Sequence, residues 1–148
     1  MILKELVYNF RKAIEAAQAN SEIGTFFRKF PTGQCGHTSD MLAQYLIDNG
    51  FKQITYVNGT YYGDDWDERW SHTWLVVNEQ IIDITGDQFK YHKKPLQNNV
   101  TVYVGPSNSF YDSFEVYPSG RFEHFGLSKQ WIHYSELLNW YETILRYL

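Results

Sequence analysis

The only cysteine of the chain, Cys35, lies in a glycine-containing stretch directly before a segment with helical periodicity. The N-terminus of a helix lowers the pKa of a thiol, because its unpaired N–H groups and its dipole favour a negative charge. Gly33 and Gly36 leave the nearby backbone uncovered, so the Cys35 N–H could donate to an oxyanion, with the Gln34 side chain as a second possible donor. These residues predict a nucleophilic thiol.

A nucleophilic thiol needs a base, and His72 is the candidate because it opens a strand-like segment after a long loop. A two-residue turn at Asn78-Glu79 would place His72 and Asp83 on one sheet face as diagonal neighbours, roughly 7–8 Å apart at the backbone. Asp83 could then orient the imidazole and stabilise its protonated form. A three-residue turn would put the two side chains on opposite faces.

Three further side chains are expected to line the pocket around these groups. Ser39 lies four residues after Cys35 and should share its helix face. Trp74 faces Asp83 in the two-residue-turn register, and Gln88 follows the strand that carries Asp83.

The acidic and aromatic stretch 60–70 has two possible roles. Trp66 and Trp70 could line a cleft beside the thiol, where acidic and aromatic groups suit a cationic or planar substrate. Alternatively, the stretch is a solvated loop whose Trp rings pack into the core.

The remaining histidines give little evidence of a metal site. His37 is close to Cys35 in sequence, but no other Cys/His cluster completes a ligand set, and one cysteine cannot form a multi-thiolate zinc site. His92, His124 and His133 have no predicted carboxylate partner and are interpreted as structural or solvated. We predict no metal and no organic cofactor.

Helical and strand patterns alternate along the chain. Apolar spacing predicts helices at both ends and after Cys35, and the helix at the end has Ser135 as its N-cap. The predicted helices are 3–19, 36–48 and 135–148, and the predicted strands are 54–57, 71–77, 81–85 and 100–104. This order predicts an α+β fold in a single domain, residues 1–148.

The pattern Pro31-x-Gly33-x-Cys35-Gly36, followed by His72 to Val77 and Ile82 to Thr85 with Gln88-Phe89, resembles the papain-like and transglutaminase-like cysteine enzyme superfamily. The resemblance covers roughly residues 30–89. It implies that the nucleophile helix packs on a central antiparallel sheet and that the chemistry occurs at amide or acyl carbonyls. The chain departs from papain at Lys29, six residues before the cysteine, where papain has glutamine.

The resemblance implies a cysteine-dependent hydrolase or acyl-transferring enzyme with a Cys35-His72-Asp83 triad. Members of the superfamily include peptidases, amidases, transglutaminases, protein-glutamine deamidases and arylamine acetyltransferases. The expected partner is therefore a peptide, a protein or a small amide or acyl substrate. The alternative is a non-catalytic binding or immunity-type module on the same fold, with a vestigial triad.

Composition excludes several other classes. The net charge is -4 with scattered Lys and Arg, so no basic surface for nucleic acid is expected. The apolar content of 43% and aromatic content of 18% exclude a disordered chain. No apolar run has membrane-spanning length, and the first residues lack the apolar core of a signal peptide, which predicts a cytoplasmic protein. No feature of the sequence specifies an oligomeric state.

Overall fold

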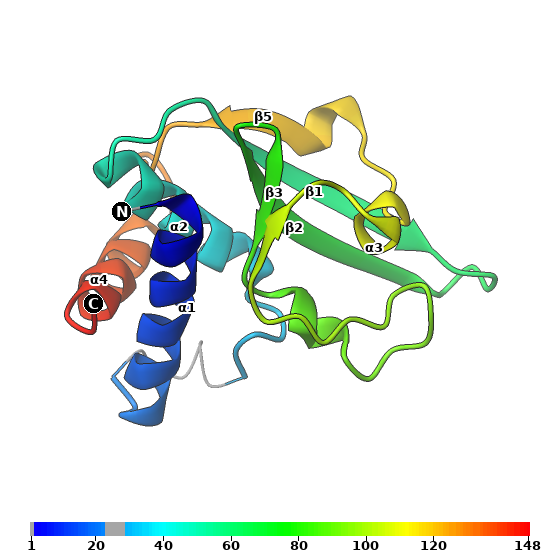
Figure 1. The fold of residues 1–148 in the computed structure, drawn as a ribbon, viewed down its shortest axis with the longest axis horizontal. Helices are drawn as coiled ribbons and strands as arrows, with labels where there is room; N and C mark the ends of the chain where they lie inside the picture. The colour runs from blue at the N-terminus through cyan, green and yellow to red at the C-terminus, as the bar shows by residue number, and fades with distance from the viewer. Residues whose placement is uncertain (1, 23–28) are drawn as a thin grey trace.

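The computed structural model describes residues 2–22 and 29–148, which form an α+β fold with a five-stranded antiparallel sheet and four α-helices (Figure 1). The helices are α1 (Leu3–Ala19), α2 (Cys35–Asp48), α3 (Ser109–Asp112) and α4 (Tyr134–Leu145), with short 3-10 helices η2 (Gly86–Phe89) and η3 (Pro118–Gly120). The strands are β1 (Ile54–Tyr62), β2 (Arg69–Val77), β3 (Gln80–Asp83), β4 (Tyr103–Gly105) and β5 (Arg121–His124), in the spatial order β4-β3-β2-β1-β5. Within the described residues, no helix is long and apolar enough to cross a membrane.

The two faces of the sheet are covered differently. Helices α1, α2 and α4 lie against one face, where their apolar stripes pack on Ile54, Leu75 and Ile82 (Figure 1). The other face is covered by η2, α3 and the adjoining loops, which contribute an aromatic cluster around Trp74 and Phe114. Because strand side chains alternate between faces, β1, β2 and β3 each contribute buried residues to both clusters. The burial of these two clusters is the main favourable term for the fold.

Of the two turn lengths that the sequence left open, the β2–β3 hairpin has the two-residue turn. Val77 pairs with Gln80 and Leu75 pairs with Ile82. The turn residues Asn78 and Glu79 have φ values of 52° and 64°, and positive φ at both central positions is the mark of a type I′ turn. This turn matches the twist of the strands, so it fixes the register on which the predicted His–Asp pairing depends.

Other boundaries differ from the prediction. Both ends of the predicted loop 60–70 are strand, because β1 continues to Tyr62 and pairs with β2 from Arg69 onward. Strand β4 begins three residues later than predicted, and β5 was not predicted because its exposed charged residues give no buried alternation. The last helix begins at Tyr134 and ends at Leu145, and His133 rather than Ser135 occupies its N-cap.

Candidate active site

Cys35 is the first residue of α2 and is half-buried. Gly33, two residues earlier, has φ +73°, a left-handed conformation that glycine adopts without steric cost. Gln34 occupies the N-cap, but its side chain does not cap the helix. The first-turn N–H groups of α2 therefore face the end of the helix where the thiol lies.

Gly36 allows the start of α2 to lie against strand β1. A Cβ atom at this position would lie 3.4 Å from the hydroxyl oxygen of Tyr56. Burial raises the pKa of Tyr56, so its hydroxyl stays protonated beside the thiol. The helix N-terminus and a neutral phenol thus lie next to Cys35.

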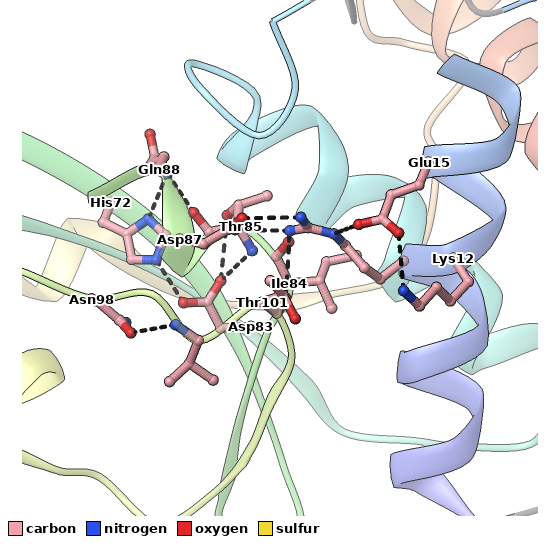
Figure 2. Close-up of polar contacts among 12 residues, drawn as sticks. Lys12, Glu15, His72, Asp83, Ile84, Thr85, Asp87, Gln88, Asn98 and Thr101 are labelled. Carbon is pink, nitrogen blue, oxygen red and sulfur yellow. Dashed lines mark hydrogen bonds and ion pairs between the residues drawn. The ribbon is translucent and has the colours of Figure 1, made fainter. Parts of the chain in front are cut away.

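His72 and Asp83 form a buried pair, as the hairpin register predicts. The His72 Nε2 atom lies 2.7 Å from Asp83 Oδ2, and the two residues are 0% and 2% exposed (Figure 2). Asp83 accepts further hydrogen bonds from the Tyr111 hydroxyl at 2.7 Å and from the Thr85 N–H at 2.9 Å. Several donors therefore compensate for the burial of this carboxylate.

The second nitrogen of His72 faces Gln88 and the thiol. Because a carboxylate only accepts hydrogen bonds, Nε2 carries a proton and the neutral ring has its lone pair on Nδ1. Gln88 Nε2 lies 3.2 Å from Nδ1 and also donates to the Thr85 carbonyl at 3.1 Å. The thiol of Cys35 also interacts with this ring, because each group shifts the pKa of the other, and Nδ1 is the nitrogen that does not face Asp83.

The electrostatics of these groups favour a thiolate–imidazolium pair. Burial lowers the pKa of His72, but the charge of Asp83 and its hydrogen bond outweigh burial and raise that pKa to about 9. Burial raises the pKa of Cys35, but His72 and Thr73 outweigh it and hold that pKa below its usual value. The pKa of Asp83 is likewise lowered, because the charge of His72 and several hydrogen bonds overcome its burial.

Thr73 also contacts the thiol, a role that sequence reasoning missed. Its side chain and its backbone both help to hold the pKa of the Cys35 thiol below its usual value. Asn58 Nδ2 donates to Thr73 Oγ1 at 2.8 Å across the β1–β2 pair. The only signal in the sequence is the position of Thr73 directly after His72.

Aromatic rings enclose the imidazole of His72. Their centroids lie 5.3 to 5.8 Å from the centroid of His72 and belong to Trp74, Phe89, Phe110 and Phe114. Such rings exclude water from the imidazole. Depending on its tilt, each ring turns either its electron-rich face or its edge toward His72. The structure thus brings two predicted pocket residues, Trp74 and Gln88, to His72.

The two tryptophans of the predicted loop lie farther out. Trp66 is 86% exposed, so the interpretation that its ring packs into the core is wrong for this residue. Trp70 is 46% exposed, and its ring meets that of His92, which in turn contacts Phe89. Trp70 is therefore connected to the surroundings of His72 only through intermediate rings.

The other predicted pocket residues belong to the start of α2. Gln34 directly precedes Cys35 and Ser39 follows it by one helical turn, and both are 6% exposed. Their roles as oxyanion donor and pocket residue stay predictions. Within the described part of the chain, no group of three or more His, Cys, Asp and Glu side chains could hold a metal ion.

His124 differs from its prediction. Its Nε2 atom lies 2.8 Å from Asp40 Oδ1, and its Nδ1 atom accepts the Gly126 N–H at 2.9 Å. The sequence indicated no carboxylate partner for this histidine, and Asp40 is that missed partner, whereas the interpretation of His124 as a structural histidine agrees with the pairing. Asp40 and His124 are 84 residues apart, and no local pattern signals such a pairing.

No family model matches the sequence, and no curated protein or solved structure matches the chain. The resemblance to papain-like and transglutaminase-like enzymes therefore depends on the motif residues alone.

Proposed function

We propose that the protein is a cysteine-dependent hydrolase or acyltransferase of the papain-like and transglutaminase-like kind. It acts on an amide, either a peptide bond or a glutamine side chain, or on an acyl substrate. The observation that carries the proposal is the arrangement around His72. One ring nitrogen is hydrogen-bonded to Asp83, and the ring interacts with the thiol of Cys35 at a helix N-terminus.

The reaction begins with transfer of the thiol proton from Cys35 to Nδ1 of His72. The hydrogen bond from Gln88 to Nδ1 is given up, and an ion pair takes its place. The thiolate then attacks the substrate carbonyl, a C–S bond forms, and the carbonyl electron pair moves onto oxygen. The first-turn N–H groups of α2 stabilise this oxyanion.

The tetrahedral intermediate collapses to a thioester on Cys35. The bond to the leaving group breaks as His72 gives its Nδ1 proton to the departing nitrogen or oxygen. Water then attacks the thioester in a hydrolase or deamidase, whereas an amine attacks it in a transferase. In both cases His72 removes the proton of the attacking group, and the thiolate is released.

The first test is the pH dependence of Cys35 alkylation by iodoacetamide. The chain has one cysteine, so labelling is unambiguous. We expect a thiolate that persists well below the free-thiol pKa of about 8.5. A midpoint near that ordinary value would contradict the proposal and favour a non-catalytic module with a vestigial triad.

The second test identifies the acyl substrate. The protein is incubated with p-nitrophenyl acetate, a glutamine-containing peptide and an acyl thioester, and intact mass spectrometry measures the thioester formed on Cys35. We expect an acyl adduct in the wild type and none in Cys35→Ala. Full turnover by Cys35→Ala would contradict the proposed nucleophile.

A further inference from the structure

Arg11 is a charged residue within the buried stripe of α1. It lies four residues after Val7 and three before Ile14, on the helix face that both of these core residues share. Only 5% of Arg11 is exposed. A guanidinium cannot be neutralised in a protein, so its burial requires partners for its five N–H donors.

The guanidinium of Arg11 contacts several acceptors. Its Nη1 and Nη2 atoms lie 2.8 and 3.0 Å from the two carboxylate oxygens of Asp87, which is a bidentate ion pair. Nη1 also donates to the carbonyls of Ile84 at 2.6 Å and of Thr101 at 3.4 Å. Nε donates to Glu15 at 2.9 Å, and Figure 2 shows the chain of contacts from Glu15 toward His72.

These acceptors flank the two groups that bond the ring of His72. The carbonyl of Ile84 follows Asp83, which holds Nε2, and the carboxylate of Asp87 precedes Gln88, which faces Nδ1. Strand β3 ends at Asp83, so sheet pairing no longer holds the chain beyond it. The guanidinium thus fixes this segment to the helical layer.

The same guanidinium also touches the segment that leads to the nucleophile. Its central carbon lies 4.8 Å from the ring centroid of Phe30, five residues before Cys35. The outer contacts are weaker, because the side chains of Glu15 and Lys12 are 35% and 55% exposed and water screens their attraction. The inner contacts, to Asp87 and Phe30, therefore matter for the site.

We propose that Arg11 is a positioning residue that sets the orientation of His72 through the segment after β3. It acts by holding Asp83 and Gln88 at the distances their hydrogen bonds to the ring require. This inference rests on the proposed function, because it assigns Arg11 a role in activating Cys35. Bidentate geometry is essential to it, so lysine should not replace arginine.

The test compares iodoacetamide alkylation of Cys35 across pH in the full chain. We expect Arg11→Met and Asp87→Asn to raise the alkylation midpoint by about one pH unit, equivalent to about 10-fold slower labelling at low pH. Arg11→Lys should resemble Arg11→Met, since an ammonium cannot bind both carboxylate oxygens. Rescue by lysine would overturn the bidentate role.

Two kinds of control separate positioning from general stability. Glu15→Gln alters only an outer contact and should leave the midpoint unchanged. Tyr141→Phe removes a partly buried hydrogen bond of 2.7 Å to Asp48, far along the chain from the segment after β3, and should lower stability without changing the midpoint. If Arg11→Met does not fold, the double variant Arg11→Met/Asp87→Leu is tested in its place, because it removes both buried charges together.

The outcomes also separate this inference from the proposed function. If His72→Gln raises the midpoint but folded Arg11 and Asp87 variants do not, the positioning role is wrong and the triad stands. If the alkylation midpoint of the wild type lies near the free-thiol pKa of about 8.5, the proposed function fails before Arg11 is tested. A midpoint shift matched by Tyr141→Phe would also overturn the positioning role.

Discussion

The described residues include two histidine–aspartate pairs of nearly equal length, one buried and one partly buried. His72 lies 2.7 Å from Asp83, and His124 lies 2.8 Å from Asp40. They differ at the other ring nitrogen. Nδ1 of His124 accepts a backbone N–H from Gly126, whereas Nδ1 of His72 faces the side-chain amide of Gln88 and the ring interacts with the thiol of Cys35.

This difference shows that a His–Asp pair does not by itself indicate catalysis. In the His124 pair, both ring nitrogens have fixed partners, so the pair ties β5 to α2. In the His72 pair, Asp83 holds Nε2, whereas Nδ1 has only the side-chain amide of Gln88 at 3.2 Å and the ring interacts with the titratable thiol of Cys35. The identity of the third group therefore distinguishes a structural pair from a candidate base.

The largest expected difference comes from removing each imidazole. His72→Gln should slow alkylation of Cys35 at acid pH by about 100-fold, because the thiolate loses its counter-ion. His124→Gln should leave the alkylation rate nearly unchanged but lower the free energy of unfolding by about 1–3 kcal/mol, since it disrupts a partly buried hydrogen-bonded pair. Iodoacetamide kinetics and urea unfolding measure both effects. If His124→Gln slowed the alkylation of Cys35 as much as His72→Gln does, His124 would belong to the active site.

Neutralising the carboxylates of Asp83 and Asp40 should also affect alkylation of Cys35 unequally, but the effect should be smaller than that of removing the imidazoles. Asp83→Asn should slow alkylation at acid pH by about 10-fold, because a neutral amide no longer stabilises the imidazolium. Asp40→Asn is the matched variant and should have little effect on labelling. If Asp83→Asn labels as fast as the wild type, Asp83 is only a structural partner.

The pH dependence of stability should report the His72 pair. The pKa of His72 is about 9 in the folded protein and 6.5 for the ordinary side chain, so the folded state binds the proton more tightly. The free energy of unfolding of wild type should therefore exceed that of His72→Gln by its largest amount below pH 6.5. This difference should be lost as the pH rises through about 9. Urea unfolding of both proteins across this range measures the difference. A difference that grows with pH would contradict the raised pKa.

The smallest expected effect comes from removing the Tyr111 hydroxyl, which donates a hydrogen bond to Asp83. Tyr111→Phe removes the 2.7 Å hydrogen bond to Asp83 and should slow alkylation a few-fold, with a stability loss of about 1 kcal/mol. Tyr141→Phe removes a bond of the same length to Asp48 and should cost similar stability with no change in labelling. Indistinguishable labelling by the two variants would exclude a positioning role for Tyr111.

Local patterns predicted the parts of the site that depend on short sequence distances. The apolar spacing after Cys35 predicted α2, and the two-residue turn at Asn78-Glu79 predicted the register that joins His72 to Asp83. These features need only helical periodicity and turn geometry. They could therefore be inferred from residues within about one element of each other.

The missed residues are connected by long-range contacts. Tyr111 reaches Asp83 across 28 residues, Arg11 reaches Asp87 across 76, and His124 reaches Asp40 across 84. Each is a polar residue in a segment whose own pattern gives no reason for its burial. Only the packing of distant elements determines such partners, so the sequence could not predict them.

The tight β2–β3 turn also has a consequence for folding. His72 and Asp83 are 11 residues apart and belong to one hairpin, whereas Cys35 precedes His72 by 37 residues in the sequence. Closing the longer loop costs about 1 kcal/mol more in chain entropy, so the base and carboxylate can assemble locally before α2 docks. A partly unfolded state that releases α2 would keep the His–Asp pair but have an ordinary thiol. Rapid labelling of Cys35 at acid pH therefore reports the docking of α2 on the sheet.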